Sequence, residues 1–258
     1  MAKKVVGSMS DWSGTLKDLF RQFHDGSLTL GQTIAFKEHR NPFEDVPRPA
    51  IVVPATPKIV TALPDIDFLV AYQKYGMEAE YRAAMELLPA WSDQNLWIVP
   101  VIAGKDRKKV VTCNMVVAAE REAGIKVWTY YNDLDANITV NDRDPARDGS
   151  YLIGFRRTVE ADEENKNLSA DMLATRKHNG STCLERKILG HGYFLATGQH
   201  LDVETVTLCT ASRYQDGGVP GVGFTLYRGR GRVHVHVDYT DGHSAVLRSR
   251  TAVPPPVA

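Results

Sequence analysis

The 258-residue chain lacks the features that most readily assign a protein to a functional class. No stretch approaches the roughly 20 apolar residues that a membrane-spanning helix needs, so no membrane span is expected. The chain also has no excess of charge of one sign, since 31 Lys and Arg balance 31 Asp and Glu. A chain with zero formal net charge is not built as a whole to bind nucleic acid or an anionic membrane surface.

Cysteine is scarce as well. Cys113, Cys183 and Cys209 lie far apart in the chain and form no C-x-x-C motif. This spacing favours buried free thiols in a reducing compartment over a disulfide framework. Lys3 and Lys4 are not followed by an apolar run, so no ordinary signal peptide is predicted. We therefore expect a cytoplasmic protein, with surface display by another route left open.

The chain does contain a regular succession of helical and strand patterns. Residues 1–44 predict a helical hairpin, and residues 45–95 predict a proline-rich linker followed by a helix. The segment 96–157 alternates strand, helix and strand patterns, which predicts a small α/β unit. The segment 158–253 predicts a separate domain, and 254–258 a disordered tail. The expected fold class is α+β.

One stretch raises a specific question of chemistry. In VHVHVDY, residues 233–239, valines alternate with His234, His236 and Asp238, so a strand would place these three polar side chains on one face. H-x-H-x-D also occurs as a zinc-binding pattern in some hydrolases. Ligands at alternate positions of a flat strand span about 13 Å, however, and must converge within about 2 Å of one ion. A solvent-facing binding surface is the favoured interpretation, and a metal-dependent hydrolase remains an alternative.

The composition of the tail is unusual. After Glu204 the chain has no Lys, Glu, Asn, Ile, Met or Trp, and residues 210–246 are rich in Gly, Tyr, His, Arg, Asp, Ser, Thr and Val. Similar mixtures occur in antibody paratopes, where Tyr supplies rigid contact area and small polar residues adapt to the ligand. The run RGRGR, residues 228–232, also leaves a nucleic-acid-binding module as an alternative.

Several longer stretches carry a more specific resemblance. They are DLFRQFHDGSLTLGQTIAFKEHRNPF, NDRDPARDGSY, RTVEADEENKNLSADMLA, GYFLATGQHLDVETVTLCTASRYQDGGVP and the closing LRSRTAV. Together they resemble a group of uncharacterised bacterial proteins with the C-terminal variable region of targets of diversity-generating retroelements. The likeness covers most of the chain except about 45–95. It implies a C-type-lectin-like C-terminal domain, related in architecture to the formylglycine-generating enzyme, that displays a variable surface.

The resemblance also implies which residues vary. A reverse transcriptase that errs at template adenines scatters AAC-type codons among Tyr, Asp, His, Ser, Gly, Arg and similar residues, but not Gln, so Gln215 is not expected to vary. The implied ligand-binding positions are Tyr214, Gly218, Gly221, Gly223, Tyr227, Arg228, His234, His236, Asp238, Tyr239, Asp241, His243 and Ser244. Val219, Pro220, Val222, Val233, Val235, Val237, Leu247 and Arg248 would form the fixed scaffold. Tyr214, Tyr227 and Tyr239 are expected to anchor the ligand.

No catalysis is expected. Formylglycine-generating enzymes rely on a cysteine pair near the C-terminus, whereas Cys209 has no second cysteine after it. No phosphate-binding loop or dinucleotide fingerprint occurs in the sequence. The sequence therefore predicts a non-catalytic protein that needs no metal or cofactor and recognises an unidentified protein or glycan, with nucleic acid a less favoured partner.

Overall fold

The structure is a computed structural model that describes residues 63–227 and 230–256, without the side chains of Tyr227 and Arg230. The hairpin predicted at 1–44 and most of the predicted linker therefore lie outside the described residues. The described residues all belong to one compact unit that mixes helices with strands, which confirms the α+β class. Within the described residues, no helix has the length and apolar character to cross a membrane.

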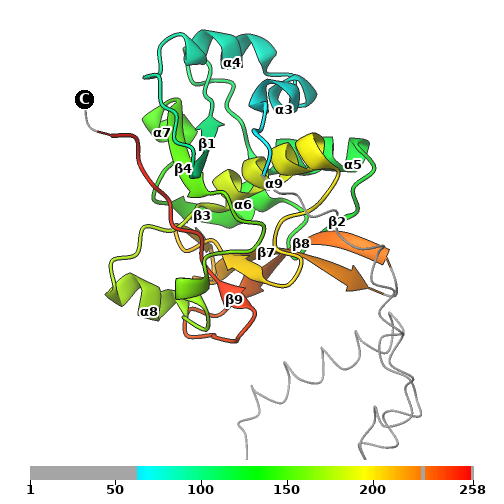
Figure 1. Ribbon diagram of the computed structural model, residues 1–258, viewed down its shortest axis with the longest axis vertical. Coiled ribbons are helices and arrows are strands. Elements are labelled where there is room, and N and C mark those ends of the chain that lie inside the picture. The colour runs from blue at the N-terminus through cyan, green and yellow to red at the C-terminus, as the bar shows by residue number, and fades with distance from the viewer. Residues whose placement is uncertain (1–62, 228–229, 257–258) are drawn as a thin grey trace, which may run out of the picture. The chain divides into compact units, whose positions relative to one another are not determined.

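Helices and strands alternate irregularly along this unit (Figure 1). The helices are α3 (Phe68–Lys74), α4 (Glu78–Met85), α5 (Cys113–Glu122), α6 (Leu134–Asn137), α7 (Pro145–Asp148), the 3₁₀ turn η1 (Glu163–Asn165), α8 (Ala170–Thr175) and α9 (Cys183–Thr197). The strands are β1 (Leu96–Val101), β2 (Val127–Thr129), β3 (Ile138–Asn141), β4 (Tyr151–Arg156), β5 (Val206–Leu208), β6 (Ser212–Tyr214), β7 (Val219–Tyr227), β8 (Arg230–Asp238) and β9 (Leu247–Arg248).

The strands form one larger mixed sheet and two small antiparallel pairs. The larger sheet has the order β2-β8-β7-β5-β9, in which β2 runs parallel to β8 and β9 runs parallel to β5. Its centre is the long antiparallel hairpin of β7 and β8. The pairs β1–β4 and β3–β6 stand apart from this sheet.

The domain boundary predicted between residues 157 and 158 is wrong. Strand β2 belongs to the segment predicted as a separate α/β unit, yet it pairs with β8 near the end of the chain. Gly154 of β4 likewise bridges to Val253, so β1 and β4 are joined to the C-terminal segment as well. Local periodicity identifies strands but not their partners, which explains the error. The tail predicted at 254–258 is described only to residue 256 and has no helix or strand there.

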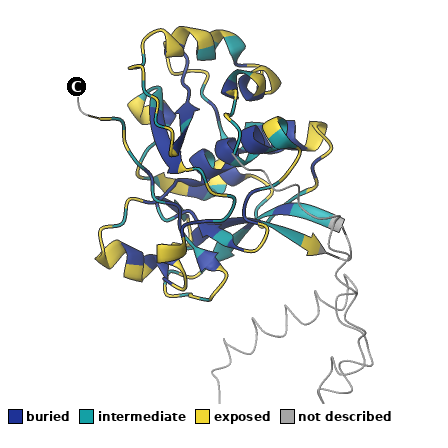
Figure 2. Ribbon diagram, viewed as in Figure 1, coloured by how far each residue is buried: buried dark blue, intermediate teal, exposed yellow. Residues whose placement is uncertain are grey.

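Helix α9 is the central element of the core (Figures 1 and 2). It begins with a capping box, in which Thr182 accepts a hydrogen bond from the Glu185 amide and Glu185 accepts one from the Thr182 amide. It ends at Gly198, whose φ of 70° is a left-handed conformation that glycine adopts without strain. Ile188 and Leu189 pack in the main apolar cluster beside residues of α3 and β1.

Helix α9 also buries three charged side chains, each with a partner from a distant segment. Glu185 binds Arg143, Lys187 binds Glu120 of α5, and Arg186 binds Asp202 with 2.8 Å between Nη2 and Oδ2. Buried charges are tolerated only when they are paired and hydrogen-bonded, so these contacts fix how α9 sits among its neighbours.

Candidate ligand-binding face

The hairpin of β7 and β8 separates apolar from polar side chains by its pairing register. Val222 pairs with Val235, and both are fully buried against the apolar cluster that contains all three cysteines. On the other face of the sheet, Gly221 pairs with His236 and Gly223 pairs with His234. The inward orientation predicted for the valines of VHVHVDY is therefore confirmed for Val235, and for Val233, which is 9% exposed.

We call the polar side the histidine face and define it by Gly221, Gly223, His234, His236 and Asp238. The glycines are needed because the imidazole rings lie over them. A Cβ at residue 221 would lie 2.6 Å from His236 Nε2 and would also collide with the Asp238 carboxylate. A Cβ at residue 223 would approach His234 Cε1 to 3.1 Å. The space above the two glycines is thus occupied by the two histidines of the neighbouring strand.

The polar groups of the histidine face are ordered by contacts with one another. The rings of His234 and His236 stack with centroids 5.0 Å apart, and His236 Nε2 lies 2.8 Å from Asp238 Oδ2. Burial, followed by the nearby His236 and Arg232 side chains, lowers the pKa of His234 to about 4. His234 is therefore neutral at pH 7, and its buried Nδ1 has no hydrogen-bond partner within the described part of the chain.

A hollow of about 350 Å³ opens on this face of the sheet. Its lining comes from β2, β5, β7, β8 and the loops before β5 and β9: Trp128, Val203, Glu204, Thr205, Val206, Phe224, Thr225, Arg232, His234, His236 and Val246. The guanidinium carbon of Arg232 lies 5.5 Å from the centroid of the Trp128 ring, within the range of a cation–π interaction. The hollow thus offers an aromatic wall, a cation and a neutral imidazole beside aliphatic surface.

One rim of the hollow is held in place by Glu160. Its carboxylate accepts hydrogen bonds from the amides of Val203 and Glu204 and from the Thr205 hydroxyl, at 3.1, 3.2 and 2.6 Å. Because three donors of one short loop converge on a single carboxylate, the loop has a defined conformation when no ligand is bound. The rim is preorganised in this sense.

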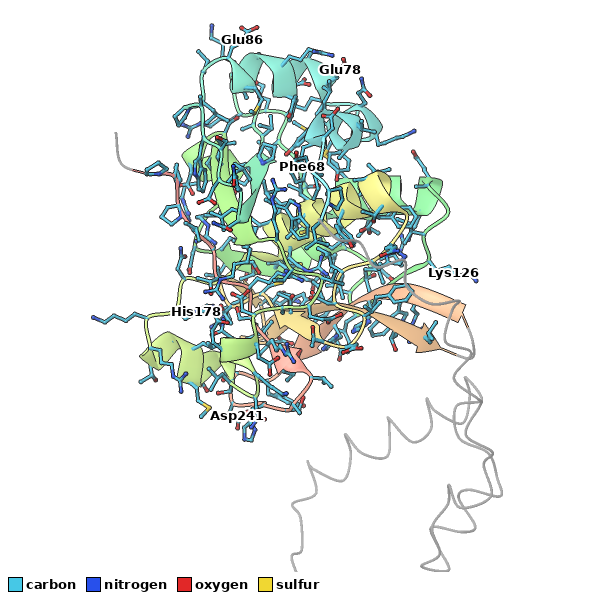
Figure 3. The ribbon with its side chains drawn as sticks, viewed as in Figure 1. Phe68, Glu78, Glu86, Lys126, His178 and Asp241 are labelled. Carbon is cyan, nitrogen blue, oxygen red and sulfur yellow. The ribbon has the colours of Figure 1, made fainter. Side chains whose placement is uncertain are left out.

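Four further predicted positions, Tyr239, Asp241, His243 and Ser244, lie in the loop that follows β8. Tyr239 is 83% exposed, and Asp241 and His243 are exposed as well. The loop lies against α8, because the Asp171 amide donates to the Thr240 carbonyl at 3.0 Å; Figure 3 labels Asp241 beside that helix. His243 Nδ1 lies 3.3 Å from Asn167 Oδ1, and Ser244 is half-buried.

The structure corrects the role predicted for Tyr214. The residue is only 2% exposed and lies in the cysteine-containing cluster, with its ring centroid 5.1 Å from that of Tyr131. It cannot serve as an exposed anchor because it is part of the core. Strand patterns do not reveal this, since β6 is three residues long and its pairing with β3 fixes which side faces inward.

The predicted glycine positions need a similar correction. Gly221 and Gly223 are buried under the histidines, and a Cβ at Gly218 would lie 2.5 Å from Val237 Cγ1. These positions have no room for a larger side chain while their neighbours keep their present conformation. The side chain of Tyr227 and all of Arg228 lie outside the described residues, as does much of RGRGR.

The metal-site alternative gains no support from this geometry. Asp238 is paired with His236, whose ring stacks on His234, so the three groups contact one another along the strand. In the described part of the chain, no group of three or more His, Cys, Asp or Glu residues could hold a metal ion.

Sequence reasoning missed the other residues of the hollow. Trp128 reaches the histidine face because β2 pairs in parallel with β8, which puts it opposite His234. Glu204 and Thr205 line the hollow because they lie in the loop whose amide and hydroxyl groups donate hydrogen bonds to Glu160. Only knowledge of the strand pairing would have identified Trp128 as part of this face.

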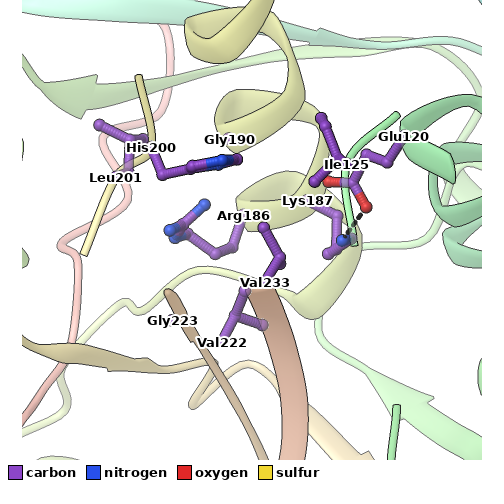
Figure 4. Close-up of a pocket in the computed structure, with 10 residues that line it drawn as sticks. All are labelled: Glu120, Ile125, Arg186, Lys187, Gly190, His200, Leu201, Val222, Gly223 and Val233. Atoms are coloured by element: carbon purple, nitrogen blue, oxygen red, sulfur yellow. Dashed lines mark hydrogen bonds and ion pairs between the residues drawn. The ribbon is translucent and has the colours of Figure 1, made fainter. Parts of the chain in front are cut away.

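A closed cavity on the opposite face of the sheet is too small for a ligand. It lies between α9 and the β7–β8 hairpin (Figure 4), and its volume of about 10 Å³ is at most that of one water. The charged side chains that line it already form ion pairs, since Lys187 binds Glu120 and Arg186 binds Asp202. We therefore assign these charges to the stability of the fold.

The competition for space on the histidine face gives a testable prediction. Gly221→Ala should lower the free energy of unfolding by about 1–3 kcal/mol, because the new methyl group displaces His236 and Asp238 from their positions. Urea denaturation at pH 7 measures this. His236→Ala removes the ring that occupies the space, so Gly221→Ala should cost less in that background. Strictly additive effects of the two substitutions would show that residues 221 and 236 do not compete.

Comparison with known proteins gives no relative. No protein-family model, no curated protein and no solved structure matches this chain.

Proposed function

We propose that this chain is a non-catalytic ligand-binding protein of the kind diversified by retroelements, and that it recognises a protein or glycan. The binding surface in this proposal consists of the histidine face, its hollow and the loop from Tyr239 to Ser244. A C-type-lectin-like arrangement of the C-terminal part belongs to the same proposal, and its support is the resemblance of the tail sequence.

One observation carries the proposal. Along β8, residues of the core alternate with residues of a solvent-facing hollow, so every second side chain can change without altering the core. Val235 is fully buried, while its neighbours His234 and His236 line the hollow. A surface that must tolerate many side chains needs this separation of scaffold from contact residues.

The chemistry of the surface also supports recognition rather than reaction. Tyr239 presents a large amphipathic side chain on the loop next to the hollow, and Trp128 supplies a second aromatic surface inside it. Such residues provide contact area at low cost in side-chain entropy and dominate many interfaces. His234, Arg232 and Glu204 would then select among ligands by hydrogen bonding and charge.

Sequencing of the DNA that flanks the gene tests the proposal. We expect a near-copy of the 3′ end beside a reverse-transcriptase gene, with mismatches confined to template adenines. They should fall at the codons for His234, His236, Asp238, Tyr239, Asp241, His243 and Ser244. They should spare the buried codons for Tyr214, Val222 and Val235. Absence of a second copy, or mismatches at buried and exposed codons alike, would refute retroelement diversification.

A further inference from the structure

All three cysteines of the chain meet in one buried cluster under the sheet. Cys113 is the first residue of α5, Cys183 is the first residue of α9, and Cys209 follows β5. All are free and buried, and they share an apolar cluster with Val222 and Val235. Three segments that are far apart in sequence thus bring their thiols together on the inner side of the β7–β8 hairpin.

Cys183 is the central member of this cluster. Its thiol interacts with those of both Cys113 and Cys209, whereas neither of the outer two has the other as a hydrogen-bonding partner. Interaction with Cys113, then with Cys209, holds the pKa of Cys183 well below its ordinary value, and the charge of Lys187 acts in the same direction. The same interaction with Cys183, together with burial, raises the pKa of Cys113.

Cys113 lines a hollow of about 200 Å³ that lies between α5, β3 and α7, and Asp135 and Arg143 are part of its wall. Neither Cys183 nor Cys209 lines that hollow. A small polar oxidant can therefore reach Cys113 while Cys183 stands behind it.

The cluster also contains a buried polar group that makes no hydrogen bond within the described residues. The Tyr214 hydroxyl is buried and has no hydrogen-bond partner among the described residues. It lies near all three thiols, whose charges contribute to raising the pKa of Tyr214 after the effect of burial. A buried hydroxyl without a partner costs free energy, so it commonly marks a place where a polar species is accommodated.

We propose that Cys113 and Cys183 are a reversible redox pair that closes to a disulfide when a hydroperoxide enters the hollow beside Cys113. As the Cys113 sulfur attacks the terminal peroxide oxygen, its proton passes to the Cys183 thiolate. The S–O bond forms, the O–O bond breaks, and the leaving alkoxide or hydroxide takes that proton from Cys183. Cys183, again a thiolate, then attacks the sulfenic sulfur, the S–S bond forms, and the leaving hydroxide takes a proton from solvent to become water. Two thiols are oxidised by two electrons in total, and one peroxide is reduced.

Thiol counting on the full chain tests this pair. After treatment with hydrogen peroxide in native buffer, quenching and unfolding, the wild-type protein should show one reactive thiol in place of three. The oxidised chain should run as a monomer on a non-reducing gel, and dithiothreitol should restore all three thiols. Peptide mapping should find Cys113 linked to Cys183.

Two variants make the test selective. Cys209→Ala should lose both remaining thiols on treatment, because the pair is intact. Cys183→Ala should form no disulfide and lose at most one thiol, because a sulfenic acid at Cys113 then has no Cys183 to react with. The wild-type peptide map decides the question by itself if Cys183→Ala does not fold. Retention of three thiols, a different linked pair, or equal thiol loss in the two variants would overturn the proposal.

Discussion

Asp202→Ala should lower the free energy of unfolding by about 3–5 kcal/mol, because it leaves two buried guanidinium groups without their carboxylate. Asp202 Oδ2 accepts a hydrogen bond from Arg186 Nε at 2.8 Å, and Oδ1 accepts one from Arg250 Nη2 at 2.6 Å. Arg186 and Arg250 are 4% and 1% exposed, so water cannot replace the lost partner. Burial alone would raise the pKa of Asp202, but the two arginines lower it below its ordinary value.

Urea denaturation at pH 7, followed by tryptophan fluorescence, measures the effect. Asp202→Asn is the matched variant, since it keeps the shape and tolerates the φ of 55° at this residue but removes the charge. It should be destabilised as well. Asp241→Ala changes an exposed aspartate and should alter stability by less than about 0.5 kcal/mol. A loss of under about 1 kcal/mol for Asp202→Ala would show that the arginines are solvated.

The second large effect is a loss of stability on acidification. His191 is fully buried, with its Nδ1 2.9 Å from the Tyr75 hydroxyl oxygen, and burial, with Lys187 and Lys74, lowers its pKa to about 4. His200 also has a pKa near 4, because it is half-buried with its ring between Phe194 and Phe224, at centroid distances of 4.9 and 4.2 Å. Both are therefore neutral in the folded protein at pH 5.

The direction of the pH effect on stability follows from proton uptake on unfolding. A histidine whose pKa is depressed by folding takes up a proton at a higher pH in the unfolded chain than in the folded one. The free energy of unfolding is therefore highest above about pH 6.5 and decreases as the pH falls toward about 4. His191 by itself should cost about 2 kcal/mol at pH 5. Urea midpoints at pH 7 and pH 5 measure this. His191→Gln, which cannot titrate, should reduce the difference; an unchanged difference would mean that His191 is not the source.

Part of the fold can be read from local sequence signals. Thr182 and Glu185 form the capping pair at the start of α9, and Gly198 lies at its end. These signals depend on neighbours within a few residues, so the printed sequence contains all the information needed. The alternation in VHVHVDY predicted the inward valines for the same reason.

What the sequence could not reveal depends on distant partners. Arg186 and Lys187 look like solvent-facing residues of a helix until Asp202 and Glu120 are placed next to them. Trp128 looks like part of a separate unit until β2 is paired with β8. Burial of charge and assembly of the hollow are both consequences of tertiary pairing, which periodicity does not encode.

The pairing of β2 with β8 also has a consequence for how the hollow forms in time. Val127 and Val233 are neighbours in the sheet although about a hundred residues separate them, and contacts of such sequence separation form slowly because a long loop must close first. During synthesis, Trp128 emerges long before the strand that it pairs with. The aromatic wall of the hollow is therefore complete only after the C-terminal hairpin has folded, and a chain truncated before β8 has no binding face to display.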